Sequence, residues 1–157
     1  RPGMKFKALL LIVLLFSSSA SAESLKIGYI DIDRVIENLS VYEKANNLLI
    51  KEFEPKKNQL VNLFDYINLL KENLEPNNDE IKKIQKLEYD FQNESELWQR
   101  KLNESQFKLL QEIELIINIA IKEFAISNNY DLILYQNGAY VGKKVDISDK
   151  IISKIEN

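Results

Sequence analysis

One break interrupts a long stretch of helical periodicity in this sequence, and that arrangement constrains the fold more than any other feature. The break is NLEPNNDEIK, Asn73–Lys82. Pro76 disfavours a helical conformation at the residue before it. Asn77 and Asn78 tolerate turns, and Asn78 can cap a helix that begins at Asp79. Because apolar residues recur at helical spacing on both sides, the sequence predicts two long antiparallel helices joined by one turn.

The first helix is predicted to run from Val41 to about Leu74. The stretch Ser40–Glu43 (SVYE) matches a capping box, in which the Ser and Glu side chains bind free backbone N–H groups. The apolar pattern lapses over Glu54–Gln59, where Pro55 lacks an N–H and crowds the preceding turn. We expect a kink there. The alternative is that Pro55 ends one helix and begins another.

The second helix is predicted from Asp79 to about Ser127, followed by Asn128-Asn129 as a terminator. At 1.5 Å per residue it would be roughly 70 Å long. A near-heptad series of apolar residues predicts the seam that faces the first helix. The series is Ile84, Leu87, Phe91, Trp98, Leu102, Leu109, Ile113, Ile116, Ala120 and Phe124.

The segment before the hairpin is short and strand-like. Apolar residues alternate along Ser24–Asp33, which predicts a β-strand. Asp33 can cap a short helical turn that follows.

The segment after the hairpin predicts two more strands and a helix. Tyr130–Tyr135 is β-like, Asn137-Gly138 is a strong hairpin turn signal, and Ala139–Gly142 would begin a returning strand. Asp146–Asp149 can cap a short amphipathic helix that carries Ile151, Ile152 and Ile155.

These elements predict an α+β fold, mainly α, in which a helical hairpin is inserted in a small β body. We expect one domain over residues 23–157, with the body at 23–39 and 129–157, the hairpin at 40–128 and its tip near 75–79. Two antiparallel helices bury only one stripe each, and three short strands add little core. Self-association is therefore expected.

Residues 1–22 are excluded from the fold. The rest of this segment is typical of a cleaved signal peptide: Lys5 and Lys7 are followed by the apolar run Ala8–Phe16 and by small residues up to Ala22. Arg1–Gly3 precede the methionine Met4 and are interpreted as residues left from cloning, outside the signal peptide. We expect cleavage before Glu23 and export across the inner membrane, and intact-mass analysis of exported protein would test it. The alternative is an uncleaved anchor, although the run is shorter than the about 20 apolar residues a span requires.

Charge and composition limit the function. Without Arg1, Lys5 and Lys7 the formal net charge of −3 becomes −6, which gives no general basis for nucleic-acid binding. The chain has no histidine and no cysteine, the commonest zinc ligands, and its four glycines form no phosphate-binding loop. We therefore predict no catalytic, cofactor or metal residues and no enzyme activity. The acidic pairs Asp31 with Asp33 and Glu112 with Glu114 are interpreted as helix caps or solvated faces.

Aromatic residues along the hairpin are the candidate functional residues. Most should fill the seam, but the adjacent pairs Tyr66-Ile67 and Leu97-Trp98 cannot both face one narrow stripe. Some apolar side chains must therefore be exposed, which marks an interaction surface. The aromatic residues are Phe53, Phe64, Tyr66, Tyr89, Phe91, Trp98 and Phe107.

Three stretches of the sequence resemble the Skp/OmpH family of periplasmic chaperones. IGYIDIDRVIE (Ile27–Glu37) is similar to the family's opening strand and turn, Ala120–Gly142 to its helix end and strand pair, and VDISDKIISKI (Val145–Ile155) to its closing helix. Their order, with a helical hairpin between them, covers essentially the whole mature chain.

The resemblance implies a homotrimer whose hairpins hang as tentacles around a cavity in the periplasm. It also implies that unfolded outer-membrane β-barrel proteins are held there without ATP and kept from aggregating. One departure concerns the tentacle tip, which is lysine-rich in many relatives. Here acids offset the lysines, so we expect no strong membrane binding. The charged residues near the tip are Lys71, Glu72, Glu75, Asp79, Glu80, Lys82, Lys83 and Lys86.

A second reading of the same features is a structural coiled-coil spacer or adaptor of the cell envelope. Long helices and missing catalytic groups fit both readings. A spacer should have a sealed seam and a polar exterior, whereas a holdase should expose apolar patches.

Overall fold

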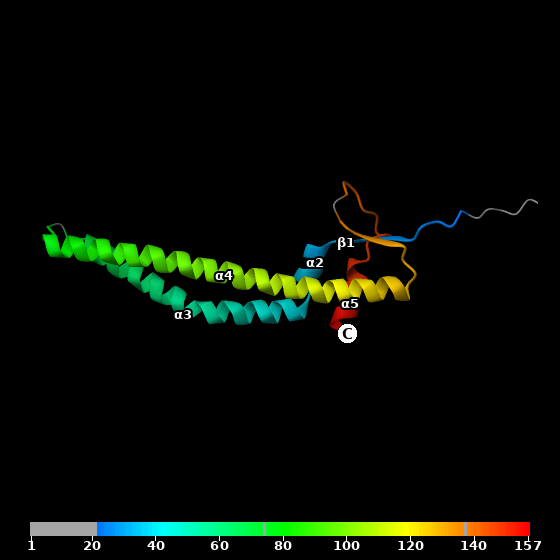
Figure 1. Ribbon diagram of the computed structural model, residues 1–157, viewed down its shortest axis with the longest axis horizontal. Coiled ribbons are helices and arrows are strands. Elements are labelled where there is room, and N and C mark those ends of the chain that lie inside the picture. The colour runs from blue at the N-terminus through cyan, green and yellow to red at the C-terminus, as the bar shows by residue number, and fades with distance from the viewer. Residues whose placement is uncertain (1–21, 74, 137) are drawn as a thin grey trace, which may run out of the picture.

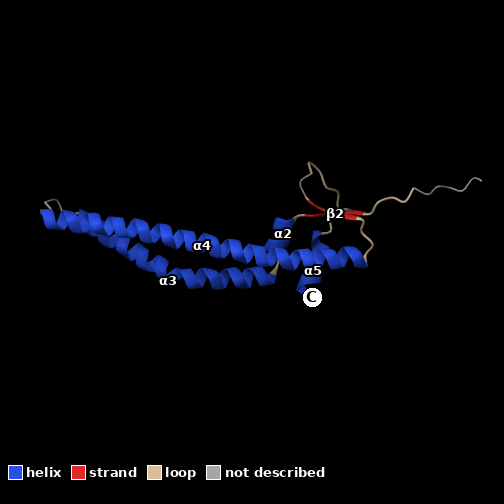
Figure 2. Ribbon diagram, in the orientation of Figure 1, coloured by secondary structure: helices blue, strands red, loops and turns tan. Residues whose placement is uncertain are grey.

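A long helical hairpin projects from a small body in the computed structural model, which describes residues 22–73, 75–136 and 138–157 (Figure 1). The helices dominate, and the strands form one short pair in the body (Figure 2). The elements in order are β1 (Ile27–Ile30), α2 (Ile32–Glu37), α3 (Ser40–Lys71), α4 (Asn78–Ser127), β2 (Leu132–Tyr135) and α5 (Ser148–Glu156).

The hairpin has the expected order and length. Helix α4 contains 50 residues, about 75 Å at 1.5 Å per residue. Its N-cap is Asn77, not Asn78 as predicted. The Glu80 N–H donates to Asn77 Oδ1 at 2.9 Å, and the Asn77 N–H donates to Glu80 Oε2 at 3.2 Å. The cap lies one residue earlier because this reciprocal pair needs a Glu or Gln three residues after the cap, and only Asn77 has one.

Helix α3 starts at Ser40, but the predicted capping box at Ser40–Glu43 is wrong. Leu39 is the N-cap residue and makes no side-chain cap bond. Ser40 instead donates from its N–H (2.7 Å) and its hydroxyl (2.8 Å) to the carboxylate of Glu156. A carboxylate from the far end of the chain therefore accepts a hydrogen bond from a free backbone N–H at the start of α3.

Pro55 lies inside α3, which is a single helix from Ser40 to Lys71. The alternative that Pro55 separates two helices is therefore wrong. Figure 1 shows α3 changing direction in its middle part. Because proline removes one intrahelical hydrogen bond and crowds the preceding turn, it accounts for this bend.

The body's sheet differs from the expected one. β1 and β2 pair in parallel, with Ile27 opposite Leu132 and Ile30 opposite Tyr135. The predicted returning strand at 139–142 is not a strand in the structure, and Asn137 of the predicted turn lies outside the described residues. Instead the Tyr29 N–H donates to the Val145 carbonyl (2.6 Å), and the Ile147 N–H donates to the Tyr29 carbonyl (2.9 Å).

Burial explains why the segment around Val145–Ile147 pairs with the other edge of β1 and not with β2. Pairing with Tyr29 places Ile147 in the core, where its side chain is fully buried. A tight hairpin beside β2 would leave that apolar side chain without this position. Tertiary packing overrides the local turn signal here.

A short helix follows β1, as expected, but Asp31 caps it rather than Asp33. Asp31 Oδ1 accepts from the Arg34 N–H at 3.1 Å, and Asp33 lies in the first turn of α2.

The hydrophobic core lies where the body meets the root of the hairpin. Helix α4 contributes three residues to it, among them Ile113 and Ile117, which pack against the body segments. The hairpin is therefore anchored through α4. The buried cluster is Ile30, Val35, Ile36, Leu39, Ile113, Ile117, Ala120, Ile147 and Ile151.

Two polar contacts join the C-terminal segment to α2 and to the start of the hairpin, and we call them the clasp. Arg34 pairs with Asp146 at 3.2 Å, and Glu156 accepts from Ser40. Burial alone raises the pKa of Asp146, but hydrogen bonds from Ser148 and the charge of Arg34 outweigh it and hold that pKa below its usual 3.8. Hydrogen bonds from Ser40 likewise lower the pKa of Glu156 below 4.5.

Acid is expected to weaken the clasp. Both carboxyls have a lower pKa in the folded state, so their contribution is complete above the unfolded-state values and is lost as pH falls through the folded-state values. Between about pH 5 and pH 3, the melting temperature of Asp146→Asn should therefore fall less than that of the unmodified chain. Thermal denaturation followed by circular dichroism measures this. Asp65→Asn, at an exposed site on α3, should keep the original slope, and equal slopes for all three chains would contradict the expectation.

Candidate binding surface on the hairpin

The aromatic residues divide between the seam and the exterior. Phe53 contacts Trp98, and Phe64 contacts Phe91 with ring centroids 5.6 Å apart. These four confirm the expected seam packing, although Phe64 remains 48% exposed. The other three, Tyr66, Tyr89 and Phe107, are exposed and form no ring pair across the seam within the described residues. The prediction that some must leave the seam is also confirmed.

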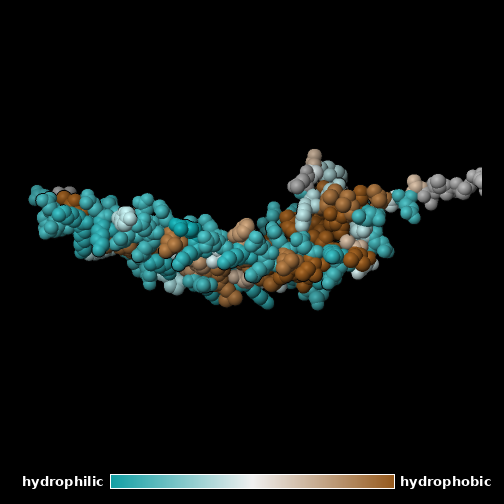
Figure 3. Space-filling model, viewed as in Figure 1, coloured by the Kyte–Doolittle hydropathy of each residue, from teal (hydrophilic) through white to brown (hydrophobic). Residues whose placement is uncertain are grey.

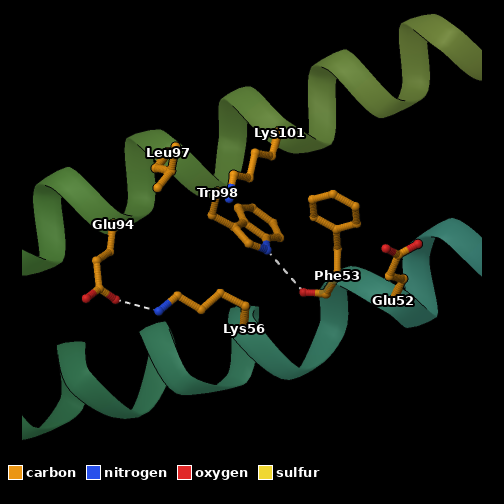
Figure 4. Close-up of a pocket in the computed structure, with 7 residues that line it drawn as sticks. All are labelled: Glu52, Phe53, Lys56, Glu94, Leu97, Trp98 and Lys101. Atoms are coloured by element: carbon orange, nitrogen blue, oxygen red, sulfur yellow. Dashed lines mark hydrogen bonds and ion pairs between the residues drawn. The ribbon is translucent and has the colours of Figure 1, made fainter.

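The bend in α3 lies against Trp98 of α4. The Trp98 Nε1–H donates to the Phe53 carbonyl at 3.1 Å, and the two rings meet edge to face at 6.4 Å. Figure 4 shows both rings between the helices. Because Phe53 is two residues before Pro55, this bond ties α4 to the turn from which proline has removed a bond.

An open hollow of about 440 Å³ lies beside this pair, and we call it the Trp98 hollow. Phe53, Trp98 and Leu97 form its apolar walls. Lys56 pairs with Glu94 at 2.6 Å across it. The remaining two rim residues, Glu52 and Lys101, make no ion pair with any described residue. The hollow is therefore apolar inside and carries both charge signs at its rim.

The seam is also incompletely filled next to this hollow. A second hollow of about 290 Å³ shares Phe53 and Trp98 and is lined further by Ile50 and Leu102. A third, lined by Leu60, Phe64, Phe91, Ser95 and Trp98, lies nearer the tip. The small side chain of Ser95 leaves space there, and its hydroxyl is buried with no partner among the residues described. The middle of the hairpin is thus less tightly packed than a regular coiled-coil seam.

A second apolar surface lies at the root of the hairpin, and we call it the root patch. Leu115, Ile119 and Ile126 recur on one face of α4 and are 61%, 52% and 70% exposed. On β2, Leu132 and Tyr135 are also exposed. Figure 3 shows hydrophobic side chains gathered over the body and the adjoining part of the hairpin. Within the described residues β2 pairs only with β1, so its second edge is open.

The tip is polar. Lys71 pairs with Glu88, Lys83 donates to the Tyr66 hydroxyl at 3.0 Å, and Asn73 donates to Glu80. Lys71 therefore has an acidic neighbour and Lys83 a polar one.

The acidic pairs form no ion site in the part of the chain that is described. Asp31 is a helix cap, whereas Asp33, Glu112 and Glu114 are exposed. No group of three potential metal ligands occurs within 22–73, 75–136 and 138–157. In the same ranges no helix is long and apolar enough to span a membrane.

Two features of the hairpin were missed from sequence. The Ser40–Glu156 contact joins residues 116 positions apart, and no local pattern signals it. The Trp98 hollow depends on the register between α3 and α4. Its only sequence signal is that Pro55 and Trp98 lie at comparable distances from the turn between the helices.

Trp98→Phe is expected to loosen the bend. The phenyl ring keeps most of the apolar contact but loses the bond to Phe53, which costs about 1 kcal/mol. Amide hydrogen exchange over residues 51–57 should speed up several-fold. Pro55→Ala should slow exchange there, because alanine restores the missing N–H. Tyr89→Phe on the exposed surface of α4 is the matched control, and unchanged exchange in both Trp98→Phe and Pro55→Ala would rule out a loosened bend.

Comparison with protein families gives a match for this chain. Residues 26–155 match the model of the family described as outer membrane protein (OmpH-like). The crystal structure of a proposed outer membrane chaperone (OmpH-like) from Caulobacter crescentus CB15 is similar in fold. Its TM-score is 0.50 at 13% identity, over 90% of this chain and 89% of that one. A search of curated proteins finds no match.

Proposed function

The chain belongs to the OmpH-like family of outer membrane proteins, and on that premise we propose that it is an ATP-independent holdase chaperone. Its clients would be unfolded outer-membrane β-barrel proteins, held in the periplasm and kept from aggregating. The proposal includes export by a cleaved signal peptide that ends at Ala22, and residues 1–21 lie outside the described residues.

The observation that carries this proposal is the unsealed seam. Hollows border Trp98 in the middle of the hairpin, and large apolar side chains such as Phe107 and Tyr89 are more than 60% exposed. A spacer would gain stability by sealing its seam and covering its exterior with polar groups. Open apolar surface on a projecting element instead favours binding of another chain. The spacer or adaptor reading remains the alternative function.

We propose a homotrimer assembled through the root patch. The open edge of β2 offers unpaired backbone groups, and exposed strand edges in soluble proteins are usually covered. Leu115, Ile119 and Ile126 lie on α4 close to the body, where association would bury them. This leaves the hairpins free to surround a client.

Client binding should rest on many weak apolar contacts. Each contributes about 1 kcal/mol, and several together hold a client while allowing exchange. The chain beyond residue 22 has a formal charge of −6, and its tip is balanced in charge. Long-range attraction to an acidic client or an anionic membrane should therefore be weak.

The test is light scattering after rapid dilution of an unfolded β-barrel protein from urea. A stoichiometric excess of the mature chain, without nucleotide, should suppress scattering by most of its amplitude. Scattering equal to that of the client alone would reject the holdase and favour the spacer. Suppression should change little between low and about 0.3 M salt, because screening acts mainly on long-range charge attraction. Loss of suppression at the higher salt would keep the holdase but reject apolar contacts as its main force.

A further inference from the structure

The Trp98 hollow is large enough to take an aromatic side chain from a bound chain. Its volume of about 440 Å³ falls within the range of about 300–1,000 Å³ typical of ligand pockets. The indole N–H already has a partner in the Phe53 carbonyl. The ring can therefore serve as an apolar wall without leaving a polar group unsatisfied.

The walls favour an aromatic occupant. Phe53 presents its ring at 64° to the indole, and Leu97 covers a third side. Aromatic rings gain from edge-to-face contact beyond the area they bury. An aromatic side chain can make that contact with both rings, whereas an aliphatic one only buries area.

The rim indicates that the occupant is part of a polypeptide. Lys56 and Glu94 satisfy each other, so Lys101 remains as a donor and Glu52 as an acceptor. An extended, unfolded segment offers both partners, since each residue has a free carbonyl and a free N–H. A small apolar molecule would use neither, and an anion would use only the lysine.

We propose that the Trp98 hollow is a docking site for an aromatic side chain of an unfolded client, with Glu52 and Lys101 binding the flanking backbone. This deepens the proposed holdase function and rests on it. The hairpin thereby has a defined anchor in addition to its diffuse apolar surface.

Trp98 is the chain's only tryptophan, so its emission reports on this hollow directly. The probe is a short unstructured Gly/Ser peptide with one central tyrosine, titrated into the mature chain with excitation selective for indole. The emission should shift to the blue with saturable binding. The same peptide with alanine in place of tyrosine should bind at least about ten-fold more weakly, the ratio that corresponds to losing one well-buried ring.

Leu97→Glu tests the site without disturbing the seam bond, because Leu97 is 44% exposed. It should weaken peptide binding at least about ten-fold. Leu69→Glu is the matched control, since Leu69 is 63% exposed on α3 and lines none of the three hollows around Trp98. It should bind within about two-fold of the original chain.

Three outcomes would overturn the docking site. These are no emission change with the tyrosine peptide, equal binding of the alanine peptide, and equal loss in Leu97→Glu and Leu69→Glu. Para-cresol binding as tightly as the peptide would reject the polypeptide occupant. None of these results affects the light-scattering test. A chain that suppresses aggregation without an emission change keeps the holdase and loses the docking site. A chain that binds the peptide but fails to suppress aggregation loses the holdase.

Discussion

Replacing Leu115 and Ile119 together by glutamate is expected to convert the proposed trimer to monomers. Both side chains belong to the root patch and are more than half exposed in the single chain. Their loss removes about 1–2 kcal/mol of apolar contact each, and a carboxylate buried without a partner costs more. Sedimentation equilibrium at micromolar concentration should give about three times the subunit mass before the change and one subunit mass after it.

The control places the same charges on the hairpin away from the body. Leu69 and Ile81 are also exposed apolar residues, but they lie towards the tip. Leu69→Glu with Ile81→Glu should leave the trimer intact. Dissociation of both double variants would indicate a general charge effect, and a monomer before any change would reject the trimer itself.

Ile117→Ala is expected to destabilise the fold by about 2–5 kcal/mol, the range for buried isoleucine truncations. Ile117 is fully buried in the core cluster where α4 meets the body. The cavity has few routes to collapse, because strands and helices from both ends of the chain surround it. Urea denaturation followed by circular dichroism measures the lost free energy of unfolding.

The adjacent residue gives a close control. Ile116 is on the same helix but is 38% exposed. Ile116→Ala should therefore cost much less, about 1 kcal/mol or under. If both substitutions lowered the free energy of unfolding equally, the face of α4 that packs into the core would not be the one seen in the structure. The comparison also tests the predicted seam, which included Ile116 rather than Ile117.

The helical hairpin could be predicted from sequence because its signals are local. Apolar spacing and the break at Asn73–Lys82 depend on residues close together in the chain, as does the bend expected at Pro55. Cap positions were less accurate. Asn77 and Asp31 replaced Asn78 and Asp33, because each cap depends on which side chain reaches a free N–H.

The sequence by itself determined the two long helices, the strand–hairpin–strand order and the final amphipathic helix. Its three characteristic stretches also indicated the family to which the chain belongs. Tertiary structure alone decided that the segment after β2 returns to the other edge of β1, since burial of Ile147 beside Tyr29 outweighed the Asn137-Gly138 turn signal. It also decided the Ser40–Glu156 contact and the Trp98 hollow. These features join residues far apart in the chain, so their free energies depend on packing that no short stretch of sequence contains.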